Sequence, residues 1–167
     1  MQLTAEQKAK VTAWVNAGAS FTEKEADVGE MPGNQIKIQS WFPESEPKGE
    51  ADPNSITEMK ATGARIVQLA AASKWLEINV LPNVRLDEAF WRTWDKLTPF
   101  VASARFSRCQ LTDAQLKSIS KAVNLRRLFL DQTPVGDTGL AALYGLNQLT
   151  YLNLVSTRIT GKGIRGL

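Results

Sequence analysis

Residues 125–148, LRRLFLDQTPVGDTGLAALYGLNQ, and residues 149–167, LTYLNLVSTRITGKGIRGL, carry apolar side chains at the same positions. The preceding stretch 101–124, VASARFSRCQLTDAQLKSISKAVN, follows the same pattern, which gives a 24-residue period. The matching apolar sets are Val101, Leu125 and Leu149; Ala104, Leu128 and Leu152; Phe106, Leu130 and Leu154; Leu111, Val135 and Ile159; Leu116, Leu140 and Ile164; Ile119, Leu143 and Leu167. A fixed period of this length is typical of a stack of repeated units.

The spacing within a unit predicts one short strand followed by one helix. The L-x-x-L-x-L start buries alternate residues of a strand, and successive strands stack in parallel along a concave face. The later GLAAL stretch, 139–143, has helical spacing for the convex side. Asp113 and Asp137 stand where a helix N-cap is expected. The predicted fold class is therefore α/β, a short right-handed solenoid of 24-residue repeats over residues 101–167.

Upstream of residue 101 the repeat becomes irregular. The elements predicted there are a helix over 56–62 ended by Gly63, strands over 65–69 and 76–80, and a helix over 86–94 that starts near Asp87. Residues 56–100 are interpreted as atypical N-terminal cap repeats. Trp75, Trp91 and Trp94 fall in these cap repeats, and we expect them to close the open end of the stack.

Residues 1–55 differ in composition from the repeats. Residues 1–18 hold a capping box, Thr4 with Gln7, and an apolar face that includes Trp14, which together predict a terminal helix. Residues 19–55 carry three lysines against eight acids and four prolines. This composition predicts an acidic, proline-containing linker. Within it, only residues 35–42 alternate well enough to form a short strand.

The lack of histidine and the single cysteine exclude most catalytic chemistry from this chain. It contains no histidine, which excludes Ser-His and Cys-His nucleophiles and His-ligated zinc. Its one cysteine, Cys109, excludes a disulfide framework and a thiolate metal cage. Cys109 is expected to be buried, since its counterparts are Thr133 and Thr157. We predict no catalytic residue, no metal and no cofactor in this chain, and no enzyme activity.

The outward positions of the predicted strands form a candidate interaction surface. These residues are Ser103, Arg105, Arg127, Phe129, Tyr151 and Asn153. An exposed Phe129 beside Tyr151, flanked by two arginines, has the composition enriched at protein interfaces. The alternative is an ordinary solvated face. Nucleic-acid binding is disfavoured: residues 56–167 carry fifteen bases against eight acids, but the bases are not striped.

The repeats resemble a known bacterial type. The stretches 133–140, TPVGDTGL, and 157–164, TRITGKGI, resemble bacterial leucine-rich repeats of the Thr-x-Ile/Val-Thr-Asp-x-Gly-Leu kind. Residues 3–19 resemble the last helix of the c-type cytochrome-like domain of planctomycete and Bacteroidetes surface proteins. Those proteins continue through an acidic linker into similar repeats. The haem-attachment motif CxxCH of that family is missing here, so any haem would lie upstream of Met1.

The resemblance and the candidate surface together give the predicted function. We expect a non-catalytic protein-interaction or scaffolding module of a cell-envelope protein, which binds a protein through the concave face of its repeats. The alternative is part of a c-type haem electron-transfer protein. The resemblance implies the periplasmic or extracellular face of the envelope, with no nucleic acid and no membrane insertion by this segment. Because the sequence stops within a unit, either another chain, such as a second copy, covers the C-terminal repeat end, or the chain is a fragment.

Overall fold

The computed structural model describes residues 42–165 of the chain. The described residues belong to one compact unit. The predicted terminal helix over 1–18 and residues 19–41 of the predicted linker lie outside the described residues, and so does the predicted strand over 35–42 apart from Phe42.

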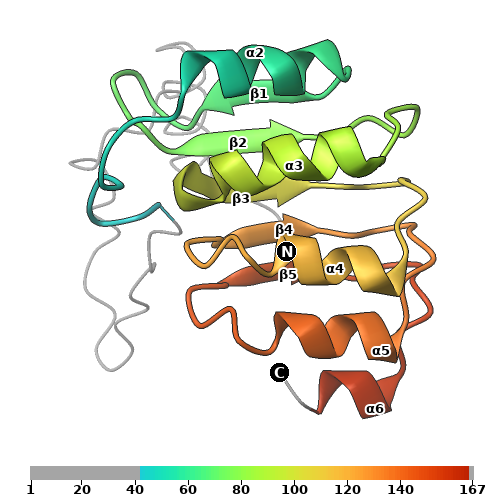
Figure 1. Ribbon diagram of the computed structural model, residues 1–167. Coiled ribbons are helices and arrows are strands. Elements are labelled where there is room, and N and C mark those ends of the chain that lie inside the picture. Colours follow the sequence, from blue (N-terminus) through green and yellow to red (C-terminus); the bar gives the residue numbers. More distant parts are fainter. Residues whose placement is uncertain (1–41, 166–167) are drawn as a thin grey trace, which may run out of the picture. The chain divides into compact units, whose positions relative to one another are not determined.

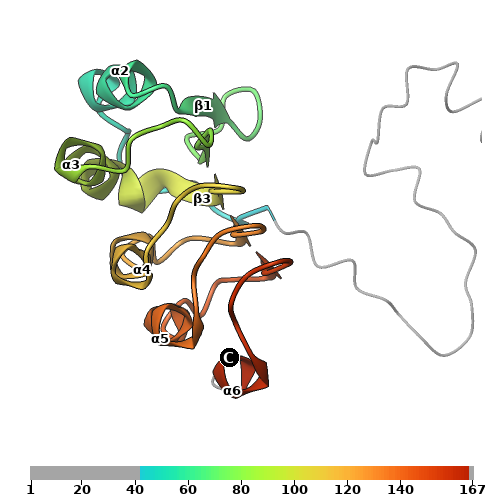
Figure 2. The ribbon, with the colours of Figure 1, turned by 90° about the vertical axis from the view of Figure 1, so that its right-hand side faces the viewer.

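Within residues 42–165 the strands form a single sheet, and helices pack on one of its faces (Figures 1 and 2). The elements in chain order are α2 (Pro53–Ala61), β1 (Arg65–Gln68), β2 (Leu76–Asn79), α3 (Glu88–Leu97), the 3-10 helix η1 (Thr98–Phe100), β3 (Val101–Arg105), α4 (Asp113–Ile119), β4 (Arg127–Phe129), α5 (Asp137–Leu140), the 3-10 helix η2 (Ala141–Leu143), β5 (Tyr151–Asn153) and α6 (Gly161–Ile164). The sheet order is β1-β2-β3-β4-β5. The α/β class is therefore confirmed.

The strands pair at a separation that follows the sequence period. In the parallel pairs β3–β4 and β4–β5, Ala104 lies beside Leu128 and Leu128 beside Leu152, so that each partner is one period further along the chain. Strand β2 also pairs with β3 in parallel. Strand β1, in the irregular cap, pairs with β2 antiparallel. The reason is the short loop over 69–75, because a parallel neighbour needs a longer crossover connection.

The turn after each of the strands β3, β4 and β5 uses the same unusual backbone conformation. Arg108, Gln132 and Ser156 have φ angles of 63°, 57° and 58°, although none of them is glycine. They follow one another at the period of the repeats. The residue after each of them closes the turn. In the last two units, Thr133 Oγ1 and Thr157 Oγ1 donate to the carbonyls of Leu130 and Leu154, just after β4 and β5. Non-glycine residues rarely adopt this region, so the turn is held by its surroundings.

The apolar core lies between the sheet and the helices. Leu111, Leu116, Leu125, Leu128 and Leu130 have no exposed surface. Each unit buries these side chains against its neighbours, which makes folding of such a stack cooperative.

An aromatic cluster joins α3 to the start of the regular units. The Phe106 ring stacks on Trp91 with a centroid distance of 6.1 Å and meets Trp94 edge-on at 5.5 Å. Trp94 is fully buried and its indole Nε1 donates to Ser118 O at 2.9 Å. The prediction that Trp94 closes the open end of the stack is therefore wrong. Trp94 packs between units, because α2 and β1 lie beyond α3 in the stack (Figure 1).

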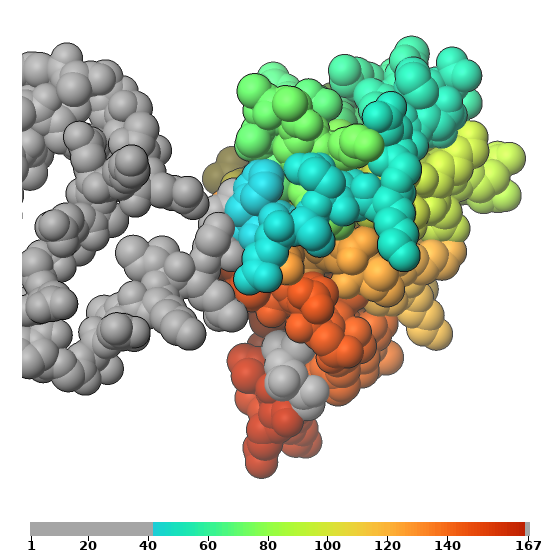
Figure 3. Space-filling model, turned by 90° about the vertical axis from the view of Figure 1, so that its left-hand side faces the viewer, coloured from blue at the N-terminus to red at the C-terminus, as the bar shows by residue number. Residues whose placement is uncertain are grey.

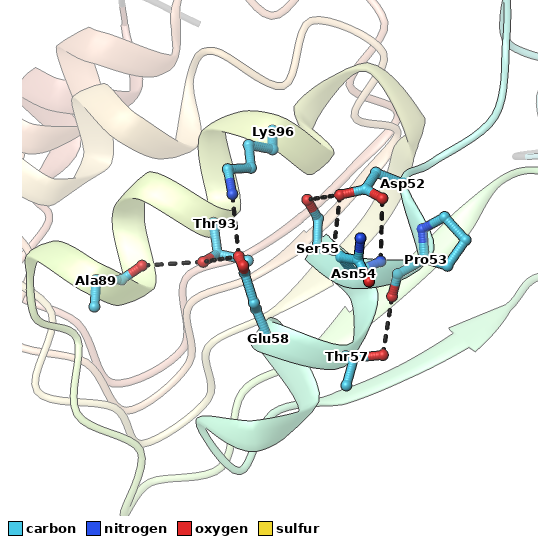
Figure 4. A network of polar contacts seen from close by, with 9 residues as sticks. All are labelled: Asp52, Pro53, Asn54, Ser55, Thr57, Glu58, Ala89, Thr93 and Lys96. Carbon is cyan, nitrogen blue, oxygen red and sulfur yellow. Dashed lines mark hydrogen bonds and ion pairs between the residues drawn. The ribbon is translucent and has the colours of Figure 1, made fainter.

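Helix α2 begins at Pro53, inside the stretch predicted as linker. Its N-cap is Asp52, whose carboxylate accepts hydrogen bonds from Asn54 N and Ser55 N at 3.1 Å and from Ser55 Oγ at 2.8 Å. Glu58 then ties α2 to α3, since its Oε2 accepts from Lys96 Nζ at 3.1 Å (Figure 4). These contacts fix the first helix of the cap on the rest of the stack.

Residues 43–50 lie at the end of the sheet where strands β2–β5 begin (Figure 1, cyan), and Figure 3 shows them on the surface there. Pro43 is buried, and the backbone oxygen of Ser45 accepts from the indole Nε1 of Trp75 at 2.8 Å. Glu46 Oε2 accepts from Lys74 N at 2.7 Å, and Lys74 Nζ pairs with Glu50 at 3.3 Å. This part of the acidic stretch is therefore held on the repeats.

Asp113 and Asp137 do not cap their own helices as predicted. The N-caps of α4 and α5 are the preceding residues, Thr112 and Gly136. Asp113 Oδ1 instead accepts from Gly136 N at 2.7 Å, one unit further on. Asp137 repeats the contact, accepting from Thr160 N at 2.7 Å and from Thr160 Oγ1 at 2.6 Å. Each aspartate thus links its unit to the next.

We expect acid to loosen α6 through Asp137. Its hydrogen bonds from the Thr160 hydroxyl and the Thr160 backbone lower the pKa of the Asp137 carboxyl below its ordinary value of 3.8. The carboxylate therefore stabilises the fold above pH 3.8, and this contribution is lost as the pH falls through the lower folded value. Amide exchange of residues 160–164, corrected for intrinsic rates, should accelerate over that range. Asp137→Asn should remove this pH step, whereas Glu88→Gln, at an exposed position of α3, should leave it unchanged.

Candidate interaction surface

One face of the sheet carries no helices (Figure 2). Two rows of side chains lie on this face. Their order follows from the strand register, because alternate residues of a strand point to opposite faces. One row consists of Val67, Glu77, Ser103, Arg127 and Tyr151. The other row consists of Arg65, Asn79, Arg105, Phe129 and Asn153. The sheet thus brings the six predicted surface residues onto one face, which we call the open face.

Phe129 lies at the centre of the open face, but the expectation that its ring is exposed is wrong. Only 6% of the residue is accessible. The guanidinium carbon of Arg105 lies 3.8 Å from the ring centroid, and that of Arg127 lies 5.2 Å from it. The Tyr151 ring packs against the same ring with centroids 4.9 Å apart. Long side chains on adjacent strands close over a central ring because neighbouring strands are only about 4.8 Å apart.

Ser103 and Asn153 have structural roles on this face. Ser103 is fully buried and its Oγ donates to Glu77 Oε2 at 2.9 Å. Asn153 Nδ2 donates to Asp131 Oδ1 at 3.2 Å, while its Oδ1 accepts from Val155 N at 3.1 Å. The other three predicted residues, Arg105, Arg127 and Tyr151, contact the Phe129 ring instead. Tyr151 is the most accessible of the three, at 45%.

Sequence reasoning missed three members of the open face: Arg65, Val67 and Glu77. The first two enter it through the antiparallel pairing of β1 with β2. Both residues are exposed, and Val67 is 55% accessible. In the sequence, the alternation of apolar Leu76 and Ile78 with Glu77 was the available indication that Glu77 faces outward.

The Arg105 guanidinium is held by stacking alone. Within residues 42–165 it forms no hydrogen bond or ion pair, and its contact is the Phe129 ring. A guanidinium carries five N–H donors in its plane, and stacking one side of that plane on a ring leaves these edge donors available. The open face therefore presents an oriented donor group beside an accessible aromatic ring.

The repeats around the open face carry a positive surplus. Residues 101–165 hold nine lysines and arginines against three acids. Those three acids all accept hydrogen bonds inside the stack: Asp113 from Gly136, Asp131 from Ser107 and Asp137 from Thr160. The potential around this part of the chain is thus set by its cations.

A shallow hollow of about 400 Å³ lies beside Tyr151 at the β5 end of the sheet. It is lined by Leu143, Tyr144, Leu146, Asn147, Leu149, Thr150, Tyr151 and Leu152. Leu152 and Leu154 are half-buried, whereas their counterparts Leu128 and Leu130 are fully buried. Self-association through this end stays a prediction.

Cys109 is buried, as predicted, and forms part of the core. Its Sγ lies 3.5 Å from Val80 O, and burial raises the pKa of its thiol to about 11. A thiol with this pKa is protonated at neutral pH, and the thiolate is the nucleophilic form. Over residues 42–165 no cluster of three or more acidic or cysteine side chains is placed to hold a metal ion. No helix in that range is long and apolar enough to cross a membrane.

Fold and surface together define the class: an α/β protein with helices on one face of a five-stranded sheet and an aromatic–arginine cluster on the other. No family model matches the chain, and no curated protein matches it. Among solved structures it is similar to an internalin (inlF) from Listeria monocytogenes, with 18% identity and a TM-score of 0.33. The match covers 44% of this chain and 28% of that one, so the chain spans less than a third of that protein's length.

Proposed function

We propose that the chain is a leucine-rich-repeat solenoid that binds a protein partner through its open face and performs no chemistry of its own. Two regularities support the solenoid: strand partners one sequence period apart, and turns at Arg108, Gln132 and Ser156 with the same separation. The Asp113 and Asp137 contacts, which join each unit to the next, add a third.

The observation that carries the binding function is the cluster around Phe129. Its ring fixes the Arg105 guanidinium, at 3.8 Å, and the Tyr151 ring, at 4.9 Å between centroids. Arginine and tyrosine are the residue types that dominate binding energy at protein interfaces. A side chain already immobilised in the free protein loses less entropy when a partner binds, so the cluster is prepared for contact.

The haem-protein alternative and the envelope location rest on the resemblance of residues 3–19. Those residues lie outside the described part of the chain, and neither the family nor the curated comparison supplies a match. Both statements stay predictions, and the proposed function does not depend on them.

Affinity capture tests the proposed function. The tagged full chain is incubated with an extract of the cells that produce it, beside the double variant Arg105→Glu/Tyr151→Ser. The control is Lys117→Glu/Val123→Ser, which changes exposed residues on and just after α4. Wild type and control should enrich the same protein, and the open-face variant should lose it at least tenfold, the loss expected for hot-spot residues worth more than about 1.4 kcal/mol.

Equal thermal melting of the variants is required before the captures are compared. If the open-face variant captures the same protein as wild type, the partner binds elsewhere and the proposed function is wrong.

A further inference from the structure

We propose that the open face binds an acidic peptide segment, whose carboxylates pair with Arg105 and with the neighbouring guanidinium of Arg127. This inference rests on the proposed function and adds to it the chemistry of the partner.

The guanidinium of Arg105 offers donors that fit a carboxylate. The guanidinium carbon lies over the Phe129 ring, 3.8 Å from the centroid, and the guanidinium has no acceptor within residues 42–165. The free edge of a guanidinium matches a carboxylate with two parallel N–H···O bonds, and such bidentate pairs are the stronger kind of hydrogen bond. A carboxylate is therefore the partner group that this edge fits best.

The net charge of the open face also favours an acidic partner. The two rows hold three arginines, Arg65, Arg105 and Arg127, against one acid, Glu77. Glu77 already accepts a hydrogen bond from Ser103. The acids of residues 101–165 are likewise engaged inside the stack. An incoming carboxylate thus meets a net positive face, whereas an incoming lysine or arginine meets repulsion.

The spacing of Arg105 and Arg127 fits alternate residues of an extended peptide. Arg105 lies on β3, and Arg127 lies on β4 opposite Ser103, two residues before Arg105. Neighbouring strands are about 4.8 Å apart and two residues of a strand span about 6.6 Å, so these diagonal positions are about 8 Å apart. Alternate residues of an extended peptide point the same way and are about 6.6 Å apart. A Glu-x-Glu segment can therefore present one carboxylate to each guanidinium, with Tyr151 beside it for an apolar contact.

The experiment measures fluorescence anisotropy of labelled synthetic peptides with the full chain at low salt. One peptide alternates glutamate and serine, and the matched peptide replaces each glutamate by glutamine. We expect the glutamate peptide to bind and the glutamine peptide not to bind. Arg105→Gln should weaken binding roughly tenfold or more, as for loss of a hydrogen bond to a charged group. Lys117→Gln removes the same charge from the helix side and should leave the affinity within about twofold.

The outcomes separate this inference from the proposed function. Equal binding of both peptides, or equal weakening by Arg105→Gln and Lys117→Gln, overturns it, because the attraction would then be unspecific. If neither peptide binds but the open-face variant still loses its captured protein, the function stands and the acidic chemistry is wrong. If both experiments fail, both proposals fall.

One further variant tests whether the chain's own acidic residues 19–41 occupy the open face in place of a separate partner. The change is Glu23→Gln/Glu25→Gln/Asp27→Asn in the full chain. Peptide binding that is unchanged by it supports a separate partner. Binding that appears only in this variant shows that the chain's own acidic stretch occupies the face, and overturns a separate acidic partner.

Discussion

Replacing Phe106 by alanine should lower the free energy of unfolding by about 3–5 kcal/mol, the range for a fully buried phenylalanine. Phe106 has no exposed surface, and its ring meets those of Phe90, Trp91 and Trp94 at centroid distances of 6.4, 6.1 and 5.5 Å. These rings come from a single helix, α3, which is anchored at its N-cap by Asp87. The helix cannot move inward to fill the cavity without breaking its own contacts, so we place the loss in the upper half of the range.

Urea unfolding followed by tryptophan fluorescence measures this loss, since Trp91 and Trp94 border the site. Val123→Ala is the matched control, because Val123 is 60% exposed and its truncation should change stability by less than about 0.5 kcal/mol. Phe106→Leu should fall between the two. A loss for Phe106→Ala no larger than that of the control would show that the aromatic cluster does not stabilise the junction of α3 with the repeats.

The sequence period predicts the part of the fold that depends on repetition. Residues one period apart, such as Leu128 and Leu152, pair across strands, because the same apolar sequence pattern places equivalent residues side by side. The same pattern places Arg105, Phe129 and Tyr151 on one face. Elements with strong local signals are also confirmed, such as α3 with its N-cap Asp87.

Features that depend on contacts between units could not be predicted from one unit alone. Asp113 looks like an N-cap in its own unit, yet its carboxylate bonds to Gly136 in the next. Phe129 occupies an outward position, yet the side chains of Arg105 and Tyr151 on the neighbouring strands cover it. Composition alone likewise suggested a linker at residues 43–50, where hydrogen bonds to Lys74 and Trp75 hold the chain.

Gly139→Ala should be the second most damaging of the substitutions considered, although alanine ordinarily favours a helix over glycine by about 1 kcal/mol. A Cβ at residue 139 would lie 2.7 Å from Asp113 Oδ1, 2.8 Å from Asp113 Cα and 2.8 Å from Leu116 Cδ1. The Cα atom belongs to the backbone of α4, so relief requires the two helices to separate. Overpacking of this kind costs about 1–3 kcal/mol, which exceeds the helix-propensity gain.

Gly145→Ala provides the matched control, because its added Cβ has no neighbour within 4 Å. Its backbone φ is not positive, so alanine fits there, and a lower entropy of the unfolded chain should leave the protein as stable as before or up to about 1 kcal/mol more stable. The two substitutions add the same methyl group, but Gly139→Ala is expected to lower the urea midpoint, whereas Gly145→Ala should leave it unchanged or raise it. Separation of α4 from α5 would also lengthen the Asp113–Gly136 hydrogen bond, so amide exchange at Gly136 should accelerate in Gly139→Ala alone. Equal midpoints for the two variants would mean that the helices of adjacent units pack less closely than the 2.8 Å approach implies.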